Sequence, residues 1–222
     1  MTEHVDVHVD FMCPWAYQTS IWLRRVRDLV GLEVRWRFFS LEEINREEGK
    51  KHPWERDWSY GWSMMRVGAA LQRIDPELLD RWYLRAGTAL HVEGRKPHRR
   101  EVAEELVRDM GLDPGLVARA IEDPTTHDAV RADHDAVVAL GGFGVPTLVF
   151  DGGHALFGPV MIDPPDGERA VRLWELVRGW VEFPHLFELQ HPKTPADLAA
   201  IGSTFRPYLE ARDWKTVQRD AP

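Results

Sequence analysis

Residues 10–16 of the chain read Asp10-Phe11-Met12-Cys13-Pro14-Trp15-Ala16. They contain the single cysteine among 222 residues, and an alternating apolar segment, Val5 to Phe11, leads into it. An amphipathic segment follows from Ala16 to Val30. The first segment has the period of a strand with one buried face, and the second has the period of a helix. The sequence therefore predicts that a strand delivers Cys13 to the first turn of a helix.

That position suggests a chemical role for Cys13. Unpaired N–H groups and the positive end of the helix dipole lower the pKa of a thiol at a helix N-terminus. Pro14 suits the first turn because no N–H is needed there. We therefore predict that Cys13 is an activated nucleophile, against the alternative of a small buried hydrophobe. Because the chain has no second cysteine, Cys13 needs an external partner for its chemistry.

Composition narrows the class of protein. The chain is 44% hydrophobic and carries a formal charge of -8, which suits one large globular domain or a domain with an insertion. The acidic balance disfavours binding to nucleic acid or to anionic membranes. No basic-then-apolar leader and no long apolar run is visible, and a single cysteine fits a reducing compartment. We expect a soluble cytoplasmic protein.

The remaining elements follow from periodicity and turn residues. Glu33 to Phe39 alternates again, so a βαβ unit with parallel strands is predicted. Leu41 to Leu140 shows helical periods and no convincing strand, after which two short strands flank Asp151-Gly152-Gly153 as a hairpin. A last helix is predicted over Glu168 to Phe183. These elements divide the chain into a discontinuous α/β domain (1–40 and 141–183), an inserted helical domain (41–140) and a C-terminal surface tail (184–222).

This order of elements resembles the DsbA-like thioredoxin-fold superfamily, an α/β class, with a helical domain inserted after the second strand. Two motifs carry the resemblance. Cys13-Pro14-Trp15-Ala16 matches the CPxC active-site pattern except at its last position, and Val145-Pro146-Thr147 matches the loop whose proline follows a cis peptide bond. The segment Phe157-Gly158-Pro159-Val160 is most similar to actinobacterial, mycothiol-linked reductases. Kappa-class glutathione transferases and 2-hydroxychromene-2-carboxylate isomerases share the layout.

Ala16 departs from the pattern. In two-cysteine members this position holds the thiol that expels a substrate from the mixed disulfide. A replacement of that cysteine by alanine, natural or engineered, removes the step. The resemblance then implies that a second small thiol resolves the mixed disulfide on Cys13, or that Cys13 only orients a bound thiol cofactor.

Other candidate site residues surround these motifs. Trp15 would shield the sulfur, and Tyr17 would donate a hydrogen bond to a thiolate or substrate, with plain packing or exposure as the alternatives. His134 falls on an inward helical stripe and would hold a proton near Cys13 or pair with a substrate carboxylate, against the alternative of a satisfied buried histidine. A cis peptide bond before Pro146 would point the N–H and C=O of Val145 at a peptide-like ligand. The full predicted set is Cys13 as the catalytic residue, with Pro14, Trp15, Ala16, Tyr17, His134, Val145, Pro146 and Thr147 binding substrate or thiol.

The sequence thus predicts a thiol-disulfide oxidoreductase that works by monothiol exchange with a low-molecular-weight thiol, mycothiol or glutathione, as co-substrate. Two alternatives stay open: a kappa-type transferase or cis/trans isomerase that uses a bound thiol cofactor, and a non-catalytic binding protein. No metal is expected, since the spacing of His91 and His98 matches no usual site. The expected partners are a small thiol or disulfide, with no nucleic acid and no membrane. The resemblance leaves a homodimer as an option.

Overall fold

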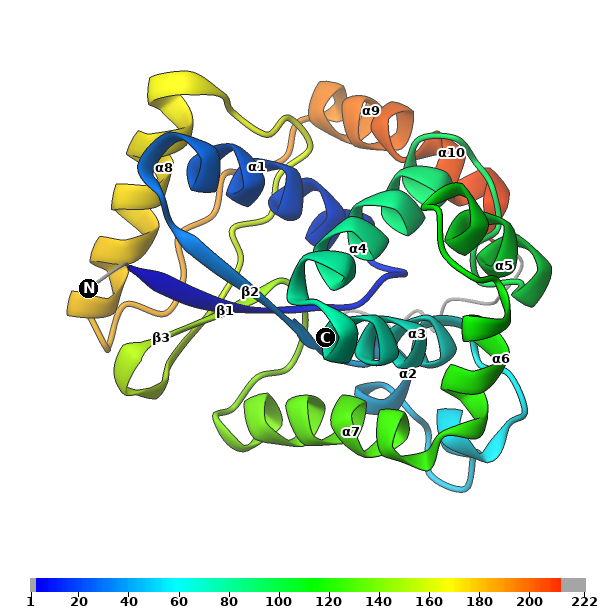
Figure 1. Cartoon of the computed structure of the whole chain (residues 1–222). Coiled ribbons are helices and arrows are strands. Elements are labelled where there is room, and N and C mark those ends of the chain that lie inside the picture. Colours follow the sequence, from blue (N-terminus) through cyan, green and yellow to red (C-terminus); the bar gives the residue numbers. More distant parts are fainter. Residues whose placement is uncertain (1–2, 213–222) are drawn as a thin grey trace.

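A computed structural model describes residues 3–212 of the chain, and a four-stranded sheet lies at its centre (Figure 1). Strand β1 (His4–Val9) pairs in parallel with β2 (Glu33–Phe38) and antiparallel with β3 (Thr147–Phe150). Strand β4 (His154–Phe157) pairs antiparallel with β3, which gives the order β2-β1-β3-β4. The predicted βαβ unit and hairpin are confirmed, and the sheet and its helices form the α/β thioredoxin arrangement.

Helices cover both faces of this sheet (Figure 1). Helix α1 (Pro14–Val30) packs with α8 (Gly167–Gly179) on one face, where the indole N–H of Trp22 donates to the carbonyl oxygen of Ala170 at 3.0 Å. Helix α7 (Pro124–Ala139) lies on the opposite face, against β2. Gly31 ends α1 in the left-handed conformation (φ 72°), as the glycine there predicts.

The segment between β2 and β3, all of which the structure describes, contains helices and no strand, as predicted. None of the helices in residues 3–212 has the length and apolar character needed to cross a membrane. Besides α7, the segment contains α2 (Leu41–Ile44), a short 3₁₀ turn (Pro53–Glu55), α3 (Tyr60–Ile74), α4 (Pro76–His91), α5 (Arg100–Asp109) and α6 (Gly115–Glu122).

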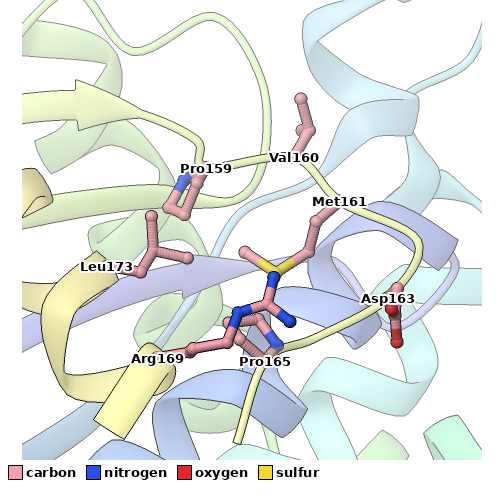
Figure 2. A pocket seen from close by; sticks show the side chains of 7 residues that line it. All are labelled: Pro159, Val160, Met161, Asp163, Pro165, Arg169 and Leu173. Carbon is pink, nitrogen blue, oxygen red and sulfur yellow. The ribbon is translucent and has the colours of Figure 1, made fainter.

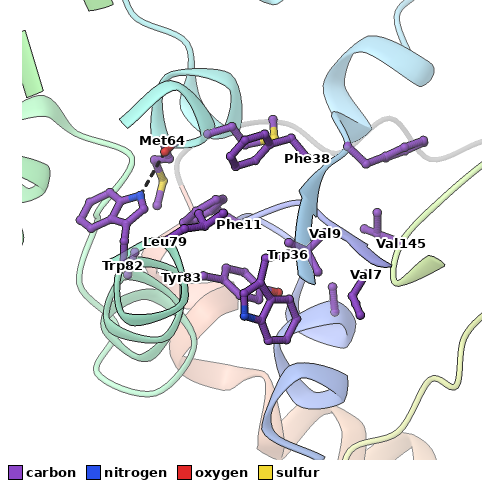
Figure 3. Packing of buried hydrophobic residues seen from close by; sticks show 14 of the residues in the cluster. Val7, Val9, Phe11, Trp36, Phe38, Met64, Leu79, Trp82, Tyr83 and Val145 are labelled. Atoms are coloured by element: carbon purple, nitrogen blue, oxygen red, sulfur yellow. Dashed lines mark hydrogen bonds between the residues drawn. The ribbon is translucent and has the colours of Figure 1, made fainter. Parts of the chain in front are cut away.

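One continuous hydrophobic core joins this helical segment to the sheet (Figure 3). Phe11, just after β1, meets the ring of Tyr83 on α4 edge to face, with 5.0 Å between centroids. Trp82, also on α4, donates its indole N–H to the carbonyl oxygen of Met64 on α3 at 3.0 Å. Shared burial of this kind holds the insertion against the loop that carries Cys13.

The C-terminal segment differs from the expected surface tail. Helix α8 passes into a 3₁₀ turn (Trp180–Glu182), and then α9 (Pro195–Thr204) and α10 (Arg206–Ala211) form. A capping box in which Thr194 and Asp197 satisfy each other's backbone N–H groups starts α9. Phe205, between the two helices, is buried. Residues 184–212 are therefore partly helical and partly built into the fold, and the rest of the predicted tail, 213–222, lies outside the described residues.

Buried histidines make the stability of this fold depend on pH. Burial lowers the pKa of His91, whose Nε2 lies 3.1 Å from the carbonyl oxygen of Phe11, to about 4, and that of His8 to about 4 as well. The pKa of a histidine in the unfolded chain is about 6.5. Between about pH 6.5 and the folded pKa of about 4, the unfolded chain therefore binds more protons than the folded one. The neutral buried histidines therefore contribute their full stability above the pKa of the unfolded state. This contribution is lost as the pH falls through the pKa of the folded state. We expect each histidine to remove about 3 kcal/mol of unfolding free energy between about pH 7 and pH 4.

Urea unfolding at a series of pH values tests this expectation, with His91→Gln compared against the parent protein. The buried carboxyl of Asp10 has its pKa raised to about 6 and acts in the opposite direction, but it is present in both proteins and cancels. His185→Gln, at an exposed position, serves as the control. Identical pH slopes for His91→Gln and the parent would contradict the assignment.

Candidate active site

The lone cysteine and the Val145-Pro146 loop form one site. Cys13 is the N-cap of α1, and its Sγ–H donates to the carbonyl oxygen of Val145 at 3.8 Å, although the two residues are 132 positions apart. The Val145–Pro146 peptide bond is cis, and so is a second one, Gly158–Pro159. The backbone of Val145 therefore faces the sulfur, as the sequence analysis predicts for this loop.

Cys13 is 6% exposed. This burial raises the pKa of its thiol to about 12. The backbone N–H groups of Ala16 and Trp15 act in the other direction, and the nearby Asp10 carboxylate adds to the increase. The predicted lowering of the thiol pKa by the helix N-terminus is thus wrong for this conformation. The N–H groups are in place, but loss of water around the sulfur outweighs them.

A pocket of about 380 Å³ opens beside Cys13, and mostly apolar side chains line it. Half of the lining comes from residues 201–209, in and between α9 and α10. Within this lining, Phe205 meets Trp15 edge to face, with ring centroids 4.7 Å apart. The lining residues are Met12, Cys13, Pro14, Trp15, Leu41, Ile201, Gly202, Phe205, Tyr208 and Leu209.

Asp10 fixes the loop that carries Cys13. Its carboxylate is buried and accepts from the backbone N–H of Met12 at 2.9 Å and from that of Leu41 at 2.8 Å. The backbone carbonyl of Asp10 accepts from the N–H of Cys13 at 3.0 Å. The carboxylate and the backbone carbonyl of Asp10 together therefore connect the turn at Cys13 to the start of the helical insertion. The sequence analysis assigns Asp10 no role, because its two carboxylate contacts depend on the tertiary fold.

Of the residues in the two motifs, Pro14 and Trp15 line the pocket. Four others are buried and absent from its lining, namely Ala16, Val145, Pro146 and Thr147. The N–H of Ala16 is directed to the sulfur. The Thr147 hydroxyl donates to the carbonyl oxygen of Gly144 at 2.7 Å, which braces the turn that holds the cis bond.

Tyr17 and His134 have partners away from the site. The hydroxyl of Tyr17 pairs with that of Thr88 at 3.1 Å, and Tyr17 is absent from the pocket lining. His134 accepts from the backbone N–H of Ser40 at 3.2 Å through Nδ1 and packs on the ring of Phe39. Burial lowers the pKa of His134, which favours the neutral ring. His134 is therefore a satisfied buried histidine, the alternative considered for it, and the structure does not bring Tyr17 or His134 to Cys13.

A second pocket, of about 320 Å³, follows the other cis bond (Figure 2). It lies between the Pro159 loop and α8, with Arg169 and Asp163 as its charged side chains, and it contains no thiol. Within residues 3–212, no group of three histidine, cysteine or carboxylate side chains is placed to hold a metal ion. The thiol of Cys13 thus makes the pocket that it lines the candidate site of chemistry.

Comparisons with known proteins agree with this architecture. Among solved structures, a putative protein disulfide isomerase from Nitrosomonas europaea superimposes with a TM-score of 0.58 and 14% identity, covering 82% of this chain and 98% of that one. A 2-hydroxychromene-2-carboxylate isomerase does so with a TM-score of 0.58 and 16% identity, covering 81% and 95%. At these identities the likeness shows the thioredoxin fold alone.

Sequence comparison is more specific. The chain is 57% identical over 215 residues to a Mycobacterium tuberculosis protein named "Uncharacterized protein Rv2286c", covering 97% of this chain and 93% of that protein. The family model described as "Rv2466c-like: Mycothiol-dependent nitroreductase Rv2466c" matches residues 12–191, which include both motifs of the site. The predicted resemblance to mycothiol-linked, DsbA-like proteins is confirmed, and the chain belongs to the Rv2466c-like family.

Proposed function

We propose that this protein is a thiol-dependent oxidoreductase in which Cys13 exchanges with a low-molecular-weight thiol, mycothiol. The observation that supports this most directly is the place of Cys13, which is the N-cap of α1 and lines the pocket of about 380 Å³ in a chain that has no second cysteine. The family's mycothiol-dependent description favours mycothiol over glutathione. A reducing cytoplasm suits such a reaction.

The proposed cycle needs one protein thiol. The Cys13 thiolate attacks one sulfur of a disulfide substrate, the substrate S–S bond breaks, and the other half leaves as a thiolate that takes up a proton. The mycothiol thiolate then attacks the substrate sulfur of the mixed disulfide and releases Cys13 as a thiolate. One half of the substrate is thereby transferred to mycothiol, and the number of disulfide bonds does not change. The backbone N–H groups of Ala16 and Trp15 stabilise the Cys13 thiolate at both stages.

Reduction of a nitro compound is a second candidate function, favoured by the family description and by the mostly apolar pocket. Cys13 and one mycothiol together supply two electrons and two protons. A nitro group then becomes a nitroso group and water while a Cys13–mycothiol disulfide forms. A second mycothiol restores Cys13 and leaves as mycothiol disulfide. This reaction therefore needs no second cysteine in the protein, because mycothiol supplies the other thiol.

Both reactions pass through a mixed disulfide on Cys13 that mycothiol resolves, and mycothiol disulfide can serve as a model disulfide substrate that forms one. Intact-protein mass spectrometry after incubation with mycothiol disulfide tests this feature. We expect a single adduct with the mass of one mycothiol, located at Cys13, that excess mycothiol removes. Cys13→Ser should form no adduct and lose at least about a hundredfold in turnover, as expected when a nucleophile is removed.

The alternatives give different results. Full turnover by Cys13→Ser would refute the role of Cys13 as the nucleophile. It would support a transferase or isomerase, in which the bound thiol itself attacks an electrophilic carbon. Absence of both adduct and turnover in the parent protein would support the non-catalytic binding protein.

A further inference from the structure

Tyr208 lies in the Cys13 pocket, and the disulfide cycle proposed above gives it no role. It is the residue of that lining, within the described chain, that carries a hydroxyl group. In a pocket lined mostly by apolar groups, a single well-placed polar group has a large effect on what happens to a charge. The charge that forms here is the thiolate of Cys13.

The surroundings of Tyr208 hold its ring in a fixed position. The ring packs against His91 with 5.4 Å between centroids, and His91 is itself anchored to the carbonyl oxygen of Phe11, two residues before Cys13. The Arg212 side chain hydrogen bonds to the Tyr208 hydroxyl. A guanidinium only donates, so in that pair the phenol oxygen accepts and keeps its own O–H proton.

We propose that the Tyr208 hydroxyl donates a hydrogen bond to the thiolate of Cys13 and so takes over part of the stabilisation that water would provide. The inference rests on the proposed function only in that the reaction forms this thiolate. The proton stays on the phenol oxygen, so no bond is made or broken at Tyr208. Burial is the largest cause that raises the pKa of Tyr208, and the charge of the nearby Cys13 is the second. A raised pKa agrees with a phenol that keeps its proton beside a thiolate.

The test is the rate of Cys13 alkylation by iodoacetamide at neutral pH, which needs no turnover. For Tyr208→Phe we expect this rate to fall about tenfold, because the thiolate loses a donor and the fraction of ionised thiol falls. Tyr17→Phe is the matched control. Its ring flanks the same His91, at 5.0 Å, but its hydroxyl pairs with Thr88. The alkylation rate of Tyr17→Phe should stay within about twofold of the rate of the parent protein.

The direction of the change in alkylation rate separates this role from a structural one. If Tyr208 only packed the C-terminal helices in place, its replacement would loosen them and expose Cys13, and the rate would rise. An unchanged or higher rate for Tyr208→Phe would therefore overturn the proposal. The mycothiol adduct assay keeps the two hypotheses apart. A lower alkylation rate with no mycothiol adduct would preserve the role of Tyr208 and refute the proposed function, whereas an adduct with an unchanged alkylation rate would do the reverse.

Discussion

Replacement of Phe205 by alanine should make Cys13 react with iodoacetamide at neutral pH at least about a hundredfold faster than in the parent protein. Phe205 lies edge to face on Trp15 and belongs to the 201–209 segment that supplies half of the pocket lining beside Cys13. Burial is the main cause that raises the pKa of Cys13 to about 12, so admitting water removes the main obstacle to its ionisation. The N–H groups of Trp15 and Ala16 then act on an exposed sulfur, and its pKa falls.

Alkylation rates measured over a range of pH test this result, with thermal unfolding as a check that Phe205→Ala is folded. Leu189→Ala, at a position 73% exposed in the same C-terminal segment, controls for the loss of an apolar side chain. A parent rate equal to that of Phe205→Ala would show that α9 and α10 do not limit access to the thiol. In that case Cys13 would react from a conformation in which water already reaches its sulfur.

The fold was predictable because its signals are local. The alternation of Val5, Val7 and Val9 and the glycine that ends α1 act over a few residues, and the structure confirms β1, α1 and β2 to within a few positions. The cis bond before Pro146 and its approach to Cys13 followed from a motif match, and geometry bears them out.

What could not be predicted depends on contacts far apart in the sequence. Periodicity places His134 on an inward face, but it does not reveal that Ser40 is its partner. No local signal shows that the hydroxyl of Tyr17 pairs with that of Thr88. The pKa of Cys13 is the clearest example. Its helix N-terminus is a local feature that lowers the value, whereas the segment that excludes water lies near the other end of the chain. Its signal was present in Ile201, Phe205 and Leu209, which are spaced four residues apart as on one helical face.

Replacement of Ala16 by cysteine should convert the site to a self-contained dithiol. Cys13 is the N-cap of α1 and position 16 follows three residues later, a spacing that brings two side chains together on one face of a helix. A thiol at position 16 is therefore expected to reach a mixed disulfide on Cys13. The small thiol then leaves as a thiolate and an intramolecular disulfide forms. An intramolecular attack outcompetes a bimolecular one at ordinary thiol concentrations, so we expect the lifetime of the mycothiol adduct to fall at least about a hundredfold.

Ala16→Ser is the matched control, because serine has nearly the same size as cysteine and cannot attack a disulfide. Ala16 is fully buried, so both variants fill the same space and carry a similar packing cost of about 1–3 kcal/mol. A long-lived adduct in Ala16→Ser and none in Ala16→Cys, followed by mass spectrometry under identical conditions, would show that the missing thiol is what makes this protein depend on an external one. If the adduct of Ala16→Cys lasts as long as that of Ala16→Ser, the two positions are out of reach of each other. The lone cysteine would then owe its dependence on a second thiol to the shape of the pocket, because restoring the motif would not restore the step.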